Sequence, residues 1–266
     1  MKRAVLFVVV LQAVAFGRID ANSPAAPGWD SFAYSAPKDL KMLPGQVWHE
    51  SGETFLRMDN FTALALAGGA SIALHNVDIH GETVDNRIAN HFNSRPPWNN
   101  TWDDAFYTVG GPGFHFAATG LWYGLAAADK DDLNRQRAWT MMTALSITGA
   151  TTLGLKFIDA DRQPNEKHGM AWPSGHTASS FTVASVLDEF YGPQIGIPAY
   201  AAAGFVGYRM MASGDHWASD VVFGGVLGWI VGHSVAGRHK QLEIAGFELM
   251  PYISDGGEGL ALVKKF

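Results

Sequence analysis

Three clusters of charged and hydrogen-bonding residues lie between positions 156 and 220. They occupy residues 156–164, 173–177 and 209–220, and each one ends or opens a segment with the composition of a helix. The second cluster contains Pro-Ser-Gly-His, and the third ends in His216 and Asp220. Side chains of these types bind anions and transfer protons, so the clusters predict one shared site if the fold brings them together.

The cations and the start of the second cluster predict a pocket for a tetrahedral oxyanion. Lys156, Arg162 and Arg209 supply fixed positive charge, and guanidinium groups match phosphate oxygens with paired donors. Ser174 is a good N-cap, and Gly175 lets a ligand approach the backbone closely. The free N–H groups of that first helical turn would point at the anion. We expect no metal and no cofactor in this pocket, because the cations neutralise the charge.

The two histidines of the clusters supply reactive groups. His216 and Asp220 are four residues apart, which would place them on one helix face. A carboxylate bonded to one ring nitrogen fixes the tautomer and leaves the other nitrogen as a lone pair. We therefore expect His216 to attack phosphorus as a nucleophile oriented by Asp220. His176 could protonate the leaving alkoxide and then activate the water that clears a phosphohistidine.

In this combination the sequence resembles the type 2 phosphatidic acid phosphatase (PAP2) superfamily, which includes bacterial class A acid phosphatases and vanadium haloperoxidases. The family pattern is Lys followed by Arg-Pro, then Pro-Ser-Gly-His, then Arg followed by His-x-x-x-Asp. The resemblance implies catalytic roles for His176, His216 and Asp220. It also implies that phosphate is bound by a second set: Lys156, Arg162, Ser174, Gly175 and Arg209.

Both arginines depart from the family spacing by one residue. The family places Arg directly before Pro in the first cluster, where this chain has Gln163, and Arg162 comes one residue early. Arg209 lies seven residues before His216, whereas the family usually has six. Arg162 could reach the site from a loop, and an unwound turn near Ser213 and Gly214 could realign Arg209. A relative that binds phosphate esters without turnover stays an alternative.

The elements around the clusters predict an all-α fold, a six-helix core bundle of the PAP2/haloperoxidase type with a small C-terminal β-hairpin. Apolar segments at 60–77, 112–128, 138–157, 174–189, 197–212 and 217–236 read as the helices. Residues 18–58 read as an extended lead-in with little regular structure, and the long connection 78–110 has room for a short helix. Two short strands, 247–253 and 259–263, would form a hairpin packed on the helical domain. The expected parts are 1–17, 18–58, 59–240 and 241–266.

Composition excludes several classes of protein. The net charge of −6 gives no basic field to hold nucleic acid, and the absence of cysteine excludes disulfides and thiolate chemistry. The basic start Met1-Lys2-Arg3, a following apolar run and small residues up to Gly17 have the pattern of a secretory signal peptide. We therefore expect a periplasmic protein, with a retained membrane anchor as the other interpretation.

The relation of the six helices to a membrane is not decided by their length. Near-zero hydropathy, charges such as Asp188 and Arg209 in or at the ends of the segments, and no clear Lys/Arg asymmetry favour a soluble bundle. An inner-membrane protein with six spans is the alternative. The C-terminal hairpin could also associate with a membrane surface or a partner.

These observations together predict a metal-independent phosphatase that acts on phosphate monoesters or on lipid phosphates or pyrophosphates. The substrate would be a phosphorylated small molecule or lipid; neither it nor the oligomeric state is fixed by the sequence. A vanadium-dependent haloperoxidase is a second hypothesis, in which the same pocket would hold vanadate with His216 as its ligand.

Overall fold

Nine helices and three strands make up the described part of the chain. The computed structural model describes residues 29–92, 95–158, 161–167, 169–239, 242–244, 247–254 and 257–263. The expected signal peptide lies outside these residues. The helices are α2 (Trp29–Phe55), α3 (Met58–Asn76), α4 (Val84–Phe92), α5 (Asn100–Val109), α6 (Pro112–Ala128), α7 (Asp132–Ile158), α8 (Gly175–Tyr191), α9 (Pro193–Ala212) and α10 (Ala218–His239). The strands are β1 (Leu242–Ile244), β2 (Phe247–Ser254) and β3 (Gly257–Val263).

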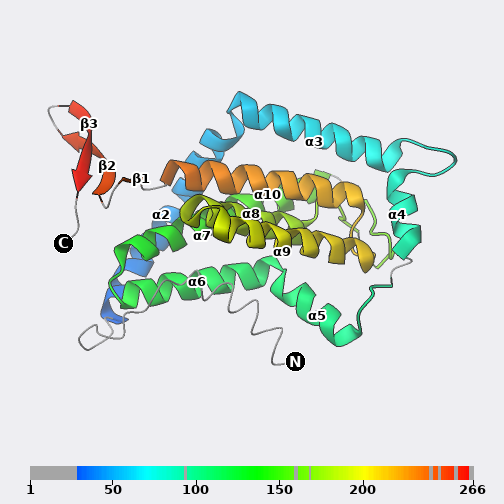
Figure 1. Cartoon of the computed structure of the whole chain (residues 1–266), viewed down its shortest axis with the longest axis horizontal. Helices are drawn as coiled ribbons and strands as arrows, with labels where there is room; N and C mark the ends of the chain where they lie inside the picture. The colour runs from blue at the N-terminus through cyan, green and yellow to red at the C-terminus, as the bar shows by residue number, and fades with distance from the viewer. Residues whose placement is uncertain are drawn as a thin grey trace.

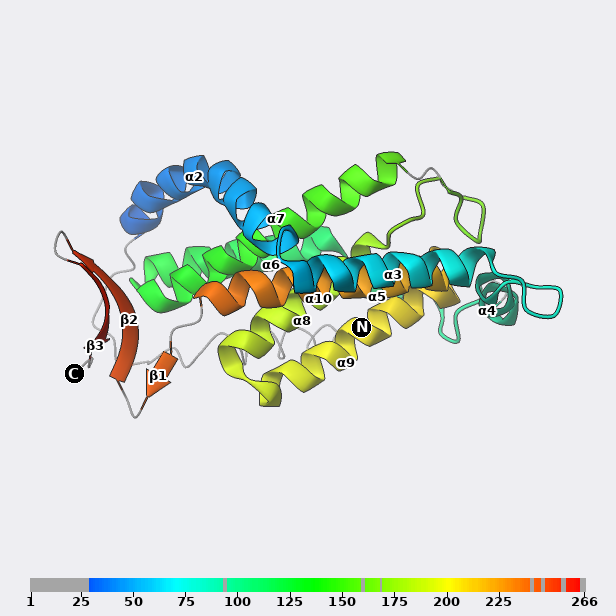
Figure 2. The same ribbon diagram turned by 90° about the horizontal axis from the view of Figure 1, so that it is seen from above.

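The six predicted core helices are confirmed as α3, α6, α7, α8, α9 and α10, and their axes run roughly side by side (Figures 1 and 2). α8 packs against α7, α9 and α10. Large side chains between these helices are fully buried, among them Leu145, Ile147, Val186, Leu227 and Val231. Burying such side chains stabilises the bundle by about 1.5–3 kcal/mol each. We call the end where α8 and α10 begin the site end, and the opposite end the α2 end.

A stripe of glycines on α10 lets this helix approach α8 closely. A Cβ added at Gly224 would lie 2.6 Å from the carbonyl oxygen of Ser174, and one at Gly228 would collide with the carbonyl oxygen of Ala178. Gly232 repeats the spacing one turn later against Thr182 and Ser185. Small residues four apart allow helix backbones to pack closely. The stripe thus fixes the start of α10 beside the start of α8.

The prediction of an extended lead-in is wrong for residues 29–55, which form α2 despite Pro37 and Pro44. Contacts with the bundle outweigh the weak local propensity. Asp39 pairs with Arg135 at 2.9 Å, and Glu50 pairs with Arg238 and His239. Burial raises the pKa of Glu50, but the hydrogen bonds from His239 and Arg238 outweigh it and bring the pKa to about 2.

The connection 78–110 carries two helices, α4 and α5, instead of one. Asn99 caps α5 by accepting a hydrogen bond from the backbone N–H of Trp102 at 3.1 Å. Aromatic rings hold α5 against α9, with Phe106 and Phe205 at 5.0 Å between centroids. Both short helices lie at the site end (Figure 1).

The C-terminal residues form a sheet of three antiparallel strands in the order β1-β2-β3 rather than two strands. β1 pairs with β2, and Ile244 lies opposite Phe247. The sheet lies past the C-terminal end of α10, whereas the sequence predicted a hairpin packed against the helical domain (Figures 1 and 2).

Large apolar side chains are exposed around the bundle. By length and composition α7 and α10 could cross a membrane, and no other described helix meets both conditions. Exposed apolar residues come from several helices: Phe61, Leu66, Ile72, Leu121, Leu153, Phe157, Ile197, Phe205, Val222 and Trp229. An apolar surface of this extent is typical of proteins that contact lipid or a partner.

Candidate active site

Hydrogen bonds join the three clusters at the site end. The backbone N–H of Ser174 donates to the carbonyl oxygen of Asp220 at 3.2 Å, which links the second cluster to the third. The indole N–H of Trp217 donates to the carbonyl oxygen of Arg162 at 2.7 Å, which links the third to the first. Segments up to 55 residues apart thus converge, as the sequence predicts.

His216 and Asp220 form a buried pair at the start of α10. His216 Nδ1 lies 3.1 Å from Asp220 Oδ2, and the two residues are 7% and 1% exposed. The helix begins at Ala218, so His216 lies in the turn before it and not on the helix itself. Asp220 Oδ2 also accepts the backbone N–H of Trp217 at 2.9 Å. With a proton on Nδ1, a neutral His216 carries its lone pair on Nε2, which is the form that attacks an electrophile.

The turn before α10 depends on a glycine. α9 ends at Ala212, and Gly214 has φ of +70°, a conformation that other residues rarely adopt. The backbone N–H groups of Asp215 and His216 both donate to the carbonyl oxygen of Met210, at 3.0 and 3.1 Å. These bonds fix the His216 backbone to the end of α9. The expected break near Ser213 and Gly214 is therefore present.

The start of α8 has the predicted capped geometry. Ser174 is the N-cap, and its hydroxyl accepts from the backbone N–H of Thr177 at 3.4 Å. Ser174 is fully buried and Gly175 partly exposed. Thr152 on α7 packs beside Gly175, and its hydroxyl is the buried side-chain group that lacks a hydrogen-bond partner among the described residues. The helix dipole and free N–H groups make this start suitable for an anion.

His176 lies one position into α8, against the entry to α6. Its ring centroid is 4.4 Å from that of Tyr107, and a Cβ added at Gly111 would lie 3.2 Å from its Nε2. The second histidine therefore lies at the site end, between Tyr107 and the start of α6.

Lys156 reaches from the last turn of α7 towards the second cluster. Its Nζ donates to the carbonyl oxygens of Met170 and Ala171, at 2.5 and 3.1 Å. Its charge interacts with that of Asp220. An ammonium has three donors, so Lys156 keeps one N–H for a ligand.

Arg209 is bound by two carboxylates that the sequence did not single out. Its Nε and one terminal nitrogen donate to the two oxygens of Asp103 at 2.8 and 2.6 Å, and the other terminal nitrogen pairs with Asp215. The guanidinium also lies over the ring of Tyr107. Burial raises the pKa of Asp103, but hydrogen bonds from Arg209 and Trp98 outweigh it and keep the pKa below its usual range. The printed contacts leave at most one guanidinium N–H for a ligand, so a phosphate could form paired hydrogen bonds with this arginine only by displacing a carboxylate.

Arg162 is the predicted phosphate ligand whose backbone, rather than its side chain, is tied to the other clusters. Its side chain is exposed, and its backbone pairs with Gly169 in an isolated β-bridge. Gln163, at the family's arginine position, is partly buried. Met210, six residues before His216, is fully buried and apolar.

Asp85 and His75 also belong to the surroundings of the site, and the sequence gave no signal for either. Asp85, 1% exposed on α4, accepts from the backbone N–H of Ser219 at 3.0 Å and lies 2.9 Å from His75 Nδ1. His75 belongs to the first core helix and Asp85 to the long connection that follows it, and both are far from the clusters along the chain. Covariation between sequences would be needed to find such contacts.

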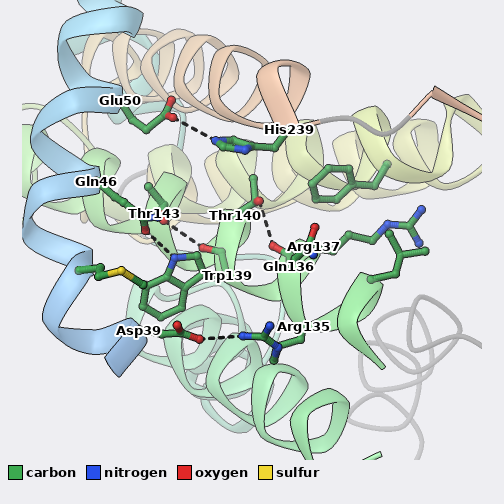
Figure 3. A pocket seen from close by; sticks show the side chains of 13 residues that line it. Asp39, Gln46, Glu50, Arg135, Gln136, Arg137, Trp139, Thr140, Thr143 and His239 are labelled. Atoms are coloured by element: carbon green, nitrogen blue, oxygen red, sulfur yellow. Dashed lines mark hydrogen bonds and ion pairs between the residues drawn. The ribbon is translucent and has the colours of Figure 1, made fainter. Parts of the chain in front are cut away.

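A separate polar cavity of about 270 Å³ lies at the α2 end, between α2 and α7 (Figure 3). Its lining includes four charged or titratable residues: Asp39, Glu50, Arg135 and His239. They form two ion pairs, Asp39–Arg135 and Glu50–His239. None of the predicted site residues lines it. Among the described residues, no group of three or more His, Asp or Glu is arranged to hold a metal ion.

Comparison with protein families decides the identity of this helical unit. The family model of the PAP2 superfamily matches residues 83–242. The chain belongs to the PAP2 superfamily. The matched region contains all three clusters and five of the six core helices, so the resemblance drawn from the motifs is confirmed.

One similar PAP2 protein is the lipid A 1-phosphatase of Porphyromonas gingivalis, which is 30% identical over 106 residues. That alignment covers 37% of this chain and 24% of the relative, so the chain matches about a quarter of the relative's length. A transmembrane PAP2-type phosphatidylglycerolphosphate phosphatase of Bacillus subtilis has a TM-score of 0.52 at 18% identity, covering 67% of this chain and 94% of that one. Aquifex aeolicus LpxE has a TM-score of 0.49 at 20% identity, covering 59% and 96%. The Bacillus structure supports the all-α PAP2 fold.

Proposed function

We propose that this PAP2 protein is a phosphatase that removes a phosphate group from a lipid through a phosphohistidine on His216. The observation that carries the proposal is that Asp220 connects the start of α8 to the start of α10. Asp220 bonds His216 Nδ1 with its carboxylate and accepts the N–H of Ser174 with its backbone oxygen. A nucleophilic nitrogen and an anion-binding helix start are thereby held together.

The reaction would proceed in two displacements. His216 Nε2 donates its lone pair to phosphorus, the P–O ester bond breaks, and His176 gives a proton to the departing alkoxide. Water then attacks the phosphohistidine, loses a proton to His176, and breaks the P–N bond to release phosphate. Lys156 and the start of α8 stabilise the charge on the phosphoryl oxygens. Arg209 could join them once Asp103 exchanges places with the phosphate.

An apolar cavity beside the site favours a lipid over a soluble ester. It measures about 230 Å³ and is lined mainly by apolar residues of α5, α8 and α9, such as Val109, Val183 and Ala199. Gly110 lines this cavity, and the next residue, Gly111, lies against His176. An acyl chain in the cavity would therefore bring its phosphate towards the histidines. The relative from Porphyromonas is a phosphatase of lipid A, and the Bacillus protein is named for phosphatidylglycerolphosphate.

We also propose that the bundle is embedded in a membrane, which replaces the soluble interpretation. The core helices are 17 to 27 residues long, and about 20 residues cross a bilayer. The exposed apolar side chains would contact lipid tails. Among the described residues outside the candidate site, Lys and Arg are more frequent in the segments at the α2 end (Lys38, Lys41, Arg57, Lys130, Arg135, Arg137, Arg238) than in those at the site end (Arg87, Arg95, Lys167). The positive-inside rule then orients the α2 end to the cytoplasm and the site end away from it.

Phosphate release by the purified chain in detergent tests the function. We expect hydrolysis of phosphatidic acid to exceed that of p-nitrophenyl phosphate, to persist in EDTA and to be blocked by vanadate. His216→Ala should lose activity by about 10⁴-fold or more, since it removes the nucleophile. Arg137→Ala, at the opposite end, is the matched control and should stay active. Full activity of the His216 variant would refute the proposed nucleophile.

A binding protein without turnover is the second candidate, and the Arg209 contacts favour it. Asp103 and Asp215 occupy the guanidinium, and Gln163 and Met210 stand at the family's arginine positions. This candidate predicts saturable binding of phosphatidic acid vesicles with no phosphate released. Release that depends on His216 would rule it out.

A further inference from the structure

Asp85 is a buried carboxylate placed behind the catalytic pair rather than in it. It is the buried residue of α4, 1% exposed, and a buried carboxylate needs hydrogen-bond donors. Its partners are three donors: the backbone N–H of Ser219 at 3.0 Å, the Ser219 hydroxyl at 2.5 Å and His75 Nδ1 at 2.9 Å. No described Lys or Arg forms a salt bridge with it.

The contact with Ser219 acts on the first turn of α10. Ser219 precedes Asp220, and its N–H is one of the groups that the helix leaves without an internal partner. The Ser219 carbonyl oxygen is held as well, since it accepts the hydroxyl of Ser71 at 3.1 Å. Ser71 in turn accepts the indole N–H of Trp172, two residues before Ser174. Ser71 of α3 and Asp85 of α4 thus hold the start of α10, and Ser71 also bonds the segment before α8.

His75 makes a second contact with the third cluster and one with the first. Its ring packs edge-on against that of Trp217, with centroids 5.6 Å apart, and Trp217 follows His216. Its Nε2 lies 3.5 Å from Asp161 in the first cluster. Asp85 and His75 therefore touch a neighbour of His216 and a neighbour of Asp220, and neither of those two residues itself.

We propose that Asp85, with His75 as its partner, is a positioning residue that sets the orientation of the His216–Asp220 pair. Loss of the Asp85 carboxylate frees the Ser219 peptide, and Asp220 then holds the imidazole less firmly in line with the phosphoryl group. Small displacements of this kind reduce turnover more than substrate binding. The inference rests on the proposed phosphatase function.

Kinetics of Asp85→Asn in the full-length protein test this role. We expect kcat to fall about tenfold to a hundredfold, as for other residues that orient a reacting group, with KM changed less than threefold. The inhibition constant for vanadate should rise by a similar factor as kcat falls, because vanadate resembles the transition state. Asp85→Glu, which keeps the charge, should recover part of the loss. Asp104→Asn, an exposed carboxylate on α5, is the control.

A purely structural role gives a different result. It would lower the fraction of folded enzyme and hence the apparent kcat, but the vanadate inhibition constant does not depend on the amount of active enzyme. An unchanged inhibition constant in Asp85→Asn would overturn the inference. If that variant does not fold, Ser219→Ala removes the hydroxyl contact alone and should raise the same constant severalfold; no rise would again overturn it. Activity of the unaltered protein with loss in His216→Ala keeps this outcome separate from failure of the proposed function.

Discussion

Arg209 binds two carboxylates at the position where the sequence predicts a phosphate ligand. A buried guanidinium needs partners, and Asp103 and Asp215 supply them. Asp103 offers two oxygens to two parallel N–H groups, which is the geometry that a phosphate would also use. Asp103 therefore ties α5 to the end of α9 at a group that a phosphate could also contact.

Replacing Asp103 by Asn tests the strength of that contact. The change removes a charge-assisted pair and leaves a buried guanidinium with one carboxylate, so we expect a loss of about 1–3 kcal/mol of stability. Thermal unfolding in detergent at neutral pH measures it. Asp104→Asn, the exposed neighbour, should differ from the unaltered protein by at most about 0.5 kcal/mol. Equal midpoints for the two variants would contradict a stabilising role for the Asp103–Arg209 pair.

At the scale of elements, the approach of α8 and α10 determines whether a site exists. The first residues of these helices carry Gly175, His176 and Asp220, and the glycine stripe sets the distance between them. Interhelical contacts of this kind are close because small residues leave room for the facing backbone. The motifs and the glycines thus act together, although the glycines do no chemistry.

Gly228→Ala should destabilise the bundle by about 1–3 kcal/mol, because its Cβ would overlap the carbonyl oxygen of Ala178. Gly237→Ala in the same helix is the matched control, since nothing lies within 4 Å of its added Cβ. Alanine there should be neutral or stabilising by about 0.4–1 kcal/mol. The comparison uses thermal unfolding together with phosphatase activity. Equal unfolding midpoints for the two variants would contradict the close approach of α8 and α10 at Gly228.

At the scale of the whole molecule, the charged residues in the core helices are paired inside the bundle, so they no longer argue for a soluble protein. Arg209 pairs with Asp103, His75 with Asp85, and Glu189 with His233. Ionisable groups that face the protein interior and pair with one another are tolerated inside membranes, where they often mark functional sites. The apolar residues, by contrast, are exposed around the outside of the bundle. These pairs remove the objection to the proposed membrane-embedded bundle.

Single cysteines can test the orientation, because the chain contains none. Lys167→Cys at the site end and Lys38→Cys at the α2 end both replace exposed residues. In spheroplasts, a thiol reagent that cannot cross membranes should label position 167 and should reach position 38 only after permeabilisation. The reverse pattern would contradict the proposed orientation and would fit a cleaved signal peptide ahead of α3. Release of the protein by a high-salt wash alone would contradict a spanning bundle.

The sequence by itself determined the six core helices, the three clusters and the family. These depend on local patterns: apolar runs of helical length, a capping serine before a helix, and Pro-Ser-Gly-His followed by His-x-x-x-Asp at a recognisable spacing. These patterns can be recognised in the sequence without any knowledge of tertiary contacts. The helix start at Gly175 follows from its capping serine, and the turn at Gly214 was expected from the shifted spacing of Arg209 and His216.

Only the tertiary structure decided which side chains surround those clusters. Asp103 lies 106 residues before Arg209, and Asp85 lies 134 residues before Ser219, so no local pattern connects either pair. α2 forms across two prolines because Asp39 and Glu50 find partners on α7 and α10. Long-range pairing of charges is set by how helices pack, and packing depends on the whole chain at once. Local propensity is too weak to predict it.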